Sequence, residues 1–91
     1  MPEQFEIIFS NQAAKYYQKL PKYQARRVDQ AFLVLEKDPI GLSDVKVMSG
    51  KPKRLRLRVG DLRIIYQISF AKRKILISVI LPRGQVYKKE K

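Results

Sequence analysis

Three arginines alternate with aliphatic residues in the second half of the chain. The segment reads Arg54-Leu55-Arg56-Leu57-Arg58-Val59, and Arg63 follows shortly after it. A guanidinium group stays protonated under ordinary conditions, and its planar set of donors fits the oxygens of a phosphate. These residues therefore indicate binding of a phosphate-rich polyanion.

Other residue types that commonly act in catalysis are missing. The chain has no histidine and no cysteine, which excludes a histidine base, a Cys–His pair and a zinc site. The few carboxylates are scattered over the predicted helices and loops, so we expect no two-metal acidic cluster. We therefore expect neither a metal nor another cofactor. An enzyme of this composition would use arginine, lysine, tyrosine, serine and backbone amides.

The alternation over residues 54–59 is typical of a half-buried strand. Gly60-Asp61 fits a two-residue hairpin turn with glycine first, and residues 62–68 run back as a second strand. Such a turn fixes the register of the hairpin. One face then has the apolar pairs Val59–Leu62, Leu57–Ile64 and Leu55–Tyr66, and the other has Arg58–Arg63, Arg56–Ile65 and Arg54–Gln67.

Like charges that face each other on antiparallel strands destabilise a sheet. Arg58 opposite Arg63 is such a pair, and Arg56 adds to the same field. The simplest interpretation is a solvated face on which arginines improve solubility and protect a sheet edge. Because the arrangement costs stability, and because arginine suits phosphate better than lysine does, we favour a bound anion.

The remaining elements follow from apolar spacing and from breaker residues. Residues 5–9 are expected to form a buried strand, residues 12–20 and 22–37 two helices, residues 39–53 a loop and residues 75–81 a last strand. Tyr66 belongs to the predicted core. The order strand–helix–helix–three strands predicts an α+β fold, with an antiparallel-rich sheet and an αα-hairpin packed on one face. With 91 residues, we expect residues 1–91 to form a single domain.

The net charge of +12 comes entirely from residues 46–91, which have fourteen basic and two acidic residues. Such a split favours a polyanionic partner over a mixed, solvated surface. Neither helix has a basic amphipathic face for a membrane, and no helix-turn-helix pattern suits duplex DNA. The charge pattern is also compatible with an acidic protein as the partner. Without cysteines, a signal pattern or a long apolar run, we expect a cytoplasmic protein that does not bind membranes.

Motifs along nearly the whole chain occur in the order found in a known family. They are Glu6-Ile7-Ile8-Phe9-Ser10, Ala13-Ala14-Lys15, Leu20-Pro21, the hairpin residues 56–66, and Arg83 with Tyr87 four residues later. In these segments the chain resembles the RelE/ParE superfamily of toxins from bacterial type II toxin–antitoxin systems. The resemblance implies the fold predicted above and a cognate antitoxin as partner.

The RelE branch of that superfamily consists of mRNA interferases, which cut mRNA in the ribosomal A site. The ribose 2′-hydroxyl attacks the adjacent phosphate, without a metal ion, so the site needs proton transfer and cations. The resemblance thus implies an endoribonuclease with mRNA and the ribosome as partners. By position it assigns catalytic roles to Arg56, Arg63, Arg83 and Tyr87, and RNA binding to Lys51, Lys53, Arg54, Arg58, Lys88 and Lys89.

Two features depart from the RelE pattern. Ile80-Leu81-Pro82 replaces the Gly with His or Lys that often precedes the last-strand arginine, and arginines replace two lysines of the second predicted strand. Because arginine is a poor base, Tyr87, Lys51 or Lys53 would have to move protons, or the ribosome would supply positioning. Three functions stay open: an mRNA interferase, a ParE-like inhibitor of DNA gyrase, and a non-catalytic RNA- or ribosome-binding relative.

Overall fold

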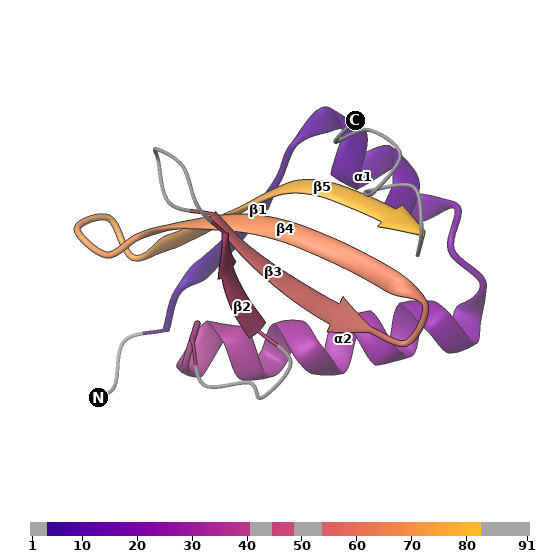
Figure 1. Cartoon of the computed structure of the whole chain (residues 1–91), viewed down its shortest axis with the longest axis horizontal. Helices are drawn as coiled ribbons and strands as arrows, with labels where there is room; N and C mark the ends of the chain where they lie inside the picture. Colours follow the sequence, from indigo (N-terminus) through magenta and orange to yellow (C-terminus); the bar gives the residue numbers. More distant parts are fainter. Residues whose placement is uncertain (1–3, 41–44, 49–53, 83–91) are drawn as a thin grey trace.

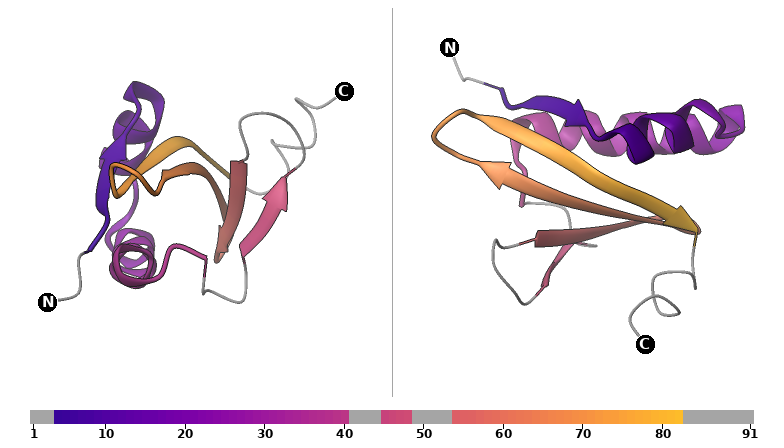
Figure 2. Two further views of the ribbon diagram at one scale, coloured as in Figure 1. Left: turned by 90° about the vertical axis from the view of Figure 1, so that its left-hand side faces the viewer. Right: turned by 90° about the horizontal axis from the view of Figure 1, so that it is seen from above.

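The computed structural model describes residues 4–40 and 54–82 and the backbone of residues 45–48. In this part of the chain, two helices lie on one side of a mixed sheet (Figures 1 and 2). The sheet has the strand order β1-β5-β4-β3-β2. The elements are β1 (Glu6–Phe9), α1 (Asn11–Gln18), α2 (Lys22–Lys37), β2 (Val45–Met48), β3 (Arg54–Val59), β4 (Leu62–Ser69) and β5 (Lys74–Pro82). The predicted α+β fold class is confirmed.

Two details differ from the prediction. The loop expected over residues 39–53 was wrong for residues 45–48, which form β2 and pair antiparallel with β3. The β1 strand, expected to be buried, is a half-buried edge strand that pairs only with β5, in parallel. Both segments are four residues long and lie at the edges of the sheet, so their pairing and burial depend on the longer strand beside each of them.

The β3–β4 hairpin has the predicted register. Gly60 in its turn has φ 57°, which glycine adopts without a steric penalty. A Cβ atom on Gly60 would lie 3.1 Å from Nη1 of Arg27 on α2, so the turn packs tightly against that helix. The observed pairs are Val59–Leu62, Arg58–Arg63, Leu57–Ile64, Arg56–Ile65 and Leu55–Tyr66.

The core lies between the helices and the apolar face of the sheet. The buried face of α2 consists of Val28, Phe32 and Leu35, which are three and four residues apart and therefore share one side of the helix. Tyr66 on β4 is fully buried, as predicted, and its hydroxyl donates a hydrogen bond to the carbonyl of Pro39 at 2.7 Å. Burial, and secondarily the charge of Asp38, raises the pKa of Tyr66 to about 12.

Side chains at the start of α1 hold that helix to β5. Ser10 caps α1 by accepting a hydrogen bond from the N–H of Ala13, and its hydroxyl donates to the carbonyl of Ser78 at 2.6 Å. Past the end of β1, the amide of Gln12 donates to the carbonyl of Ile80 and accepts from its N–H, both at 3.0 Å. The Gln12 side chain thus continues the hydrogen bonding of the sheet where β1 ends.

Candidate nucleic-acid interface

The side of the sheet away from the helices bears the arginines of the hairpin. Residues on this side alternate with the buried core residues, and successive cross-strand rows are two residues, or about 7 Å, apart. We call this side the arginine face; it has Arg54, Arg56, Arg58 and Arg63. The first rows are Arg58–Arg63–Leu81 and Lys46–Arg56–Ile65–Val79.

The arginines of this face differ in exposure. Arg54 and Arg58 are exposed and Arg56 is half-buried, but Arg63 is only 4% exposed. Their common side of the ribbon is as predicted, and the alternative of a purely solvated face does not fit the burial of Arg63. On the inner strand β4, Arg63 lies between Arg58 on β3 and the buried Leu81 on β5.

Burial of Arg63 argues against a purely solubilising role. A charged group is costly to remove from water unless it is paired and hydrogen-bonded, and a residue kept for solubility would remain at the surface. The side chain of Arg63 is instead buried. The more accessible Arg58 lies opposite it, and Arg56 belongs to the next cross-strand row. This arrangement suits binding of an anion that partly enters the surface.

The structure does not test every predicted site residue. Arg54, Arg56, Arg58 and Arg63 lie on one face, as described above. The register also places Lys46 of β2 beside Arg56, a cationic position that the sequence analysis missed because it assigned residues 39–53 to a loop. The alternation in Val45-Lys46-Val47-Met48 was the signal for it. The predicted residues Lys51, Lys53, Arg83, Tyr87, Lys88 and Lys89 lie outside the described residues.

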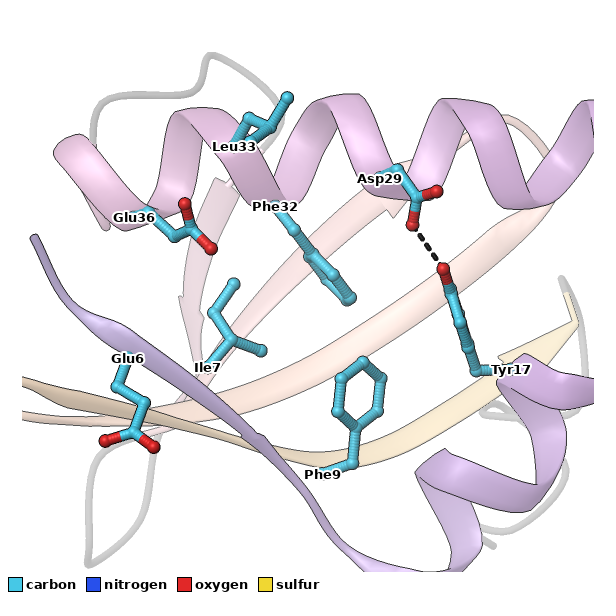
Figure 3. A pocket seen from close by; sticks show the side chains of 8 residues that line it. All are labelled: Glu6, Ile7, Phe9, Tyr17, Asp29, Phe32, Leu33 and Glu36. Atoms are coloured by element: carbon cyan, nitrogen blue, oxygen red, sulfur yellow. Dashed lines mark hydrogen bonds between the residues drawn. The ribbon is translucent and has the colours of Figure 1, made fainter.

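A second surface of interest is a hollow of about 500 Å³ between β1 and α2 (Figure 3). Phe9 lies at its base and contacts Phe32 and Tyr17, with ring centroids 5.6 and 5.4 Å apart. The Tyr17 hydroxyl donates a hydrogen bond to Asp29, and this bond, with burial, raises the pKa of Tyr17. The lining residues are the apolar Ile7, Phe9, Phe32 and Leu33, the acidic Glu6, Asp29 and Glu36, and Tyr17.

No group of His, Cys, Asp or Glu among the described residues is arranged to hold a metal ion. None of the helices found there has the length and apolar character needed to cross a membrane.

Comparison with known proteins identifies the family. The model of the family described as "ParE toxin of type II toxin-antitoxin system, parDE" matches residues 7–87. The chain belongs to the RelE/ParE superfamily of type II toxins. The resemblance found in the sequence is therefore confirmed, and the matched region of this toxin includes the whole arginine face as well as Arg83 and Tyr87.

Solved structures of RelE toxins have a similar fold. The RelE–RelB complex from Pyrococcus horikoshii OT3 is 30% identical, with a TM-score of 0.80 over 90% of this chain and 98% of that chain. The RelBE complex from Mycobacterium tuberculosis is 23% identical (TM-score 0.72; 88% and 99% covered). The isolated E. coli RelE toxin is 20% identical (TM-score 0.70; 94% and 94%). The last two show a shared fold only, and no curated protein matches the chain.

Proposed function

We propose that this toxin is a ribosome-dependent endoribonuclease, which cleaves mRNA in the A site through attack of the 2′-hydroxyl on the adjacent phosphate and so inhibits translation. The observation that supports this best is the buried Arg63 beside Arg58 and Arg56. A cation that is already held in place stabilises the charge of the reacting phosphate without reorganising during the reaction.

The proposed roles follow from the chemistry of the residues. Arg56, Arg63 and Arg83 bind the scissile phosphate and stabilise its additional charge. Tyr87 stacks on a base or moves a proton. Because arginine is a poor base, positioning of the mRNA by the ribosome supplies a large share of the rate. Contacts with the rest of the RNA come from Lys51, Lys53, Arg54, Arg58, Lys88 and Lys89.

Inhibition of DNA gyrase is the second candidate, because the family model that matches the chain is named for ParE toxins. The 30% identity to a RelE toxin, over 98% of that toxin's chain, favours the nuclease. The arginine face favours it too, since it presents phosphate-binding groups on an open sheet surface.

Mapping of mRNA ends in cells tests the proposal. After brief expression from a tightly repressed promoter, we expect new 5′ ends within translated codons. Arg56→Ala should abolish them, and so should Arg63→Ala; Arg56 is half-buried, so its variant is the safer one for folding. Arg26→Ala, on the exposed surface of α2, should keep them. Intact mRNAs together with inhibited supercoiling by purified gyrase would establish the alternative instead.

We also propose that a cognate antitoxin binds this toxin and covers the arginine face with acidic residues. Support comes from the similar structures, several of which are complexes of a RelE toxin with its antitoxin. Co-expression with the product of the adjacent reading frame should yield a stable complex and restore growth. Purification of the toxin alone, together with continued growth arrest, would contradict this pairing.

A further inference from the structure

A second hollow lies on the same side of the sheet as the arginines, at the opposite end of β4. It has a volume of about 300 Å³, and its floor and rim include Ile8, Gln67, Ser69, Lys72, Lys74 and Leu76. The register explains how these residues meet. Ile8, Leu76 and Gln67 form one cross-strand row, and Lys74 and Ser69 belong to the next.

The lining has the chemistry of a nucleotide site. Lys72 and Lys74 are exposed and provide ammonium groups for a phosphate. Leu76 is an exposed aliphatic side chain (38% exposed) beside the half-buried Ile8, so the floor offers an apolar surface to the face of a base. The amide of Gln67 has both donors and acceptors for the edge of that base.

The basic residues at the β4–β5 turn have different neighbours: Arg73 contacts Phe5, and Lys72 and Lys74 line the hollow. Arg73 has φ 53°, a left-handed conformation that is unfavourable for a residue with a side chain. Its guanidinium lies over the ring of Phe5, 4.5 Å from the centroid. The two lysines on either side of Arg73 line the hollow instead. Glu6 lies opposite Lys74 in register and is two residues before Ile8 on β1, so it is on the same side of the sheet as Lys74. It also borders the hollow beside α2.

The hollow is too far from Arg63 to contact the same nucleotide. Arg63 and Ser69 are six residues apart on β4, which corresponds to about 20 Å along a strand. We infer that this hollow binds one nucleotide of a single-stranded RNA, several positions away from the phosphate at Arg63. Lys72 and Lys74 bind its phosphate, and Leu76 and Ile8 contact its base. That the strand is mRNA rests on the proposed function.

Binding of uncleavable RNA tests the inference without any need for nuclease activity. The probes are fluorescent 2′-O-methyl oligoadenylates of two lengths, one long enough to span both sites and one too short. The long probe should bind the toxin about tenfold more tightly. In the variant Lys72→Ala/Lys74→Ala this difference should largely disappear, and the slope of log K against log salt for the long probe should fall by about 0.7, the value for one lost phosphate contact.

The matched control is Lys15→Ala/Lys19→Ala, which removes the same charge elsewhere. Lys15 is an exposed residue of α1, and Lys19 is the exposed residue directly after the helix. It should keep the length effect; an equal loss in both variants would mean that only net charge matters and would overturn the inference. Leu76→Ser should weaken the long probe about threefold. Unchanged affinity of the Leu76→Ser variant for the long probe would contradict a contact between Leu76 and the base.

Ribosome pelleting distinguishes the two sources of RNA. If the strand is mRNA, the Lys72/Lys74 variant should bind more weakly to ribosomes programmed with mRNA and normally to vacant ones. An equal loss with vacant ribosomes would assign the hollow to ribosomal RNA and overturn the mRNA path. Failure of the proposed nuclease function would instead appear as intact mRNAs in cells, with the oligonucleotide results unchanged.

Discussion

Arg58 and Arg63 face each other across the β3–β4 hairpin, in a position where unlike charges or small polar residues would be more stable. Arg63 is buried and Arg58 is exposed, so the hydration of the two charges is unequal. Their repulsion is present in the folded protein and largely absent in the unfolded chain. A phosphate between or beside them would offset it, which links the stability of the hairpin to occupancy of the site.

Replacing Arg58 by threonine is therefore expected to stabilise the protein while it weakens RNA binding. The gain should be about 0.5 kcal/mol at low ionic strength and should shrink as salt screens the remaining charges. Urea unfolding at two salt concentrations measures it. Arg54→Thr is the control, because the residue opposite Arg54 on β2 is Met48. Equal stabilisation by both substitutions would contradict a specific Arg58–Arg63 repulsion.

The raised pKa of Tyr66 predicts that the protein becomes less stable at alkaline pH. Its pKa of about 12 in the folded protein exceeds the ordinary value of about 10. Below pH 10 the tyrosine is protonated in both states. Between about pH 10 and 12 only the unfolded chain loses the proton, so the free energy of unfolding should fall by up to about 1.4 kcal/mol per pH unit.

Tyr66→Phe should remove this part of the alkaline destabilisation, although it costs about 1 kcal/mol through loss of the hydrogen bond to Pro39. Urea unfolding across the alkaline range compares the variant with the wild type. Tyr23→Phe, at a position that is 65% exposed, should leave the curve unchanged. An alkaline profile that is the same with and without Tyr66 would show that other groups cause the loss of stability.

At the scale of elements, side chains at the start of α1 bind the backbone of β5 close in sequence to the predicted site residue Arg83. The β5 strand has a bulge, because Ile65 pairs with Val79 and Tyr66 with Ile77. Ser10 binds the carbonyl of Ser78 at this bulge, and Gln12 binds both backbone groups of Ile80. The end of β5, which directly precedes Arg83 in the sequence, is thus held by a helix on the far side of the sheet.

We expect Gln12→Leu to destabilise the protein by about 1–3 kcal/mol, because it leaves the N–H and carbonyl of Ile80 without their partner. If Gln12 also positions Arg83, kcat for RNA cleavage should fall while KM changes little. Gln12→Glu, which keeps the acceptor, should be intermediate in both. Gln18→Leu, at an exposed position of the same helix, is the control. Lower stability with an unchanged kcat would make Gln12 a structural residue only.

At the scale of the whole molecule, two surfaces of the toxin have different charge. The arginine face and the hollow at Lys72 and Lys74 are cationic, whereas the rim of the hollow beside α2 has Glu6, Asp29 and Glu36. A uniformly acidic segment would be attracted to the first surface and repelled from the rim of that hollow. An antitoxin that contacts both surfaces would therefore need an acidic segment and a separate segment with apolar and basic residues.

The hollow beside α2 gives a prediction for that second segment. Leu33, at its rim, is 60% exposed, so Leu33→Asp should leave the fold intact and weaken the complex with the antitoxin by at least about tenfold, or 1.4 kcal/mol. RNA affinity should not change. Val34→Asp, at a 41% exposed position of α2 that does not line the hollow, is the control. Unchanged affinity for the antitoxin in Leu33→Asp would place its apolar contacts elsewhere.

The salt dependence of RNA binding belongs to the molecule as a whole. With a net charge of +12, the free toxin should bind RNA of any sequence at low ionic strength, and its affinity should fall steeply as salt is raised. Titrations with the uncleavable oligonucleotides over a range of salt measure this slope. The toxin–antitoxin complex should show a much weaker slope, because its arginine face is covered. Equal slopes for toxin and complex would contradict that coverage.

The sequence by itself determined the local features of this protein. Alternation over residues 54–59 and a glycine at the turn were enough for the hairpin and its register, because a two-residue turn leaves one pairing that keeps the apolar side chains together. The same pattern placed four arginines on one side. Helix spacing, the Ser10 cap and the break at Pro21 were enough for α1 and α2.

Only the tertiary structure decided which of these residues are buried and which segments meet. The strand at residues 5–9 was predicted from the sequence, but its parallel pairing with β5 was not. Residues 45–48 form β2 by pairing with the longer β3, and their short alternation was overlooked within the predicted loop. Arg63 is buried although it lies on the side of the sheet away from the helices, which the pattern of the hairpin did not indicate. The hollow at Lys72 and Lys74 needs Ile8 from β1, which lies more than sixty residues away in the chain. Such long-range neighbours are set by packing of the whole sheet, and local sequence patterns do not contain them.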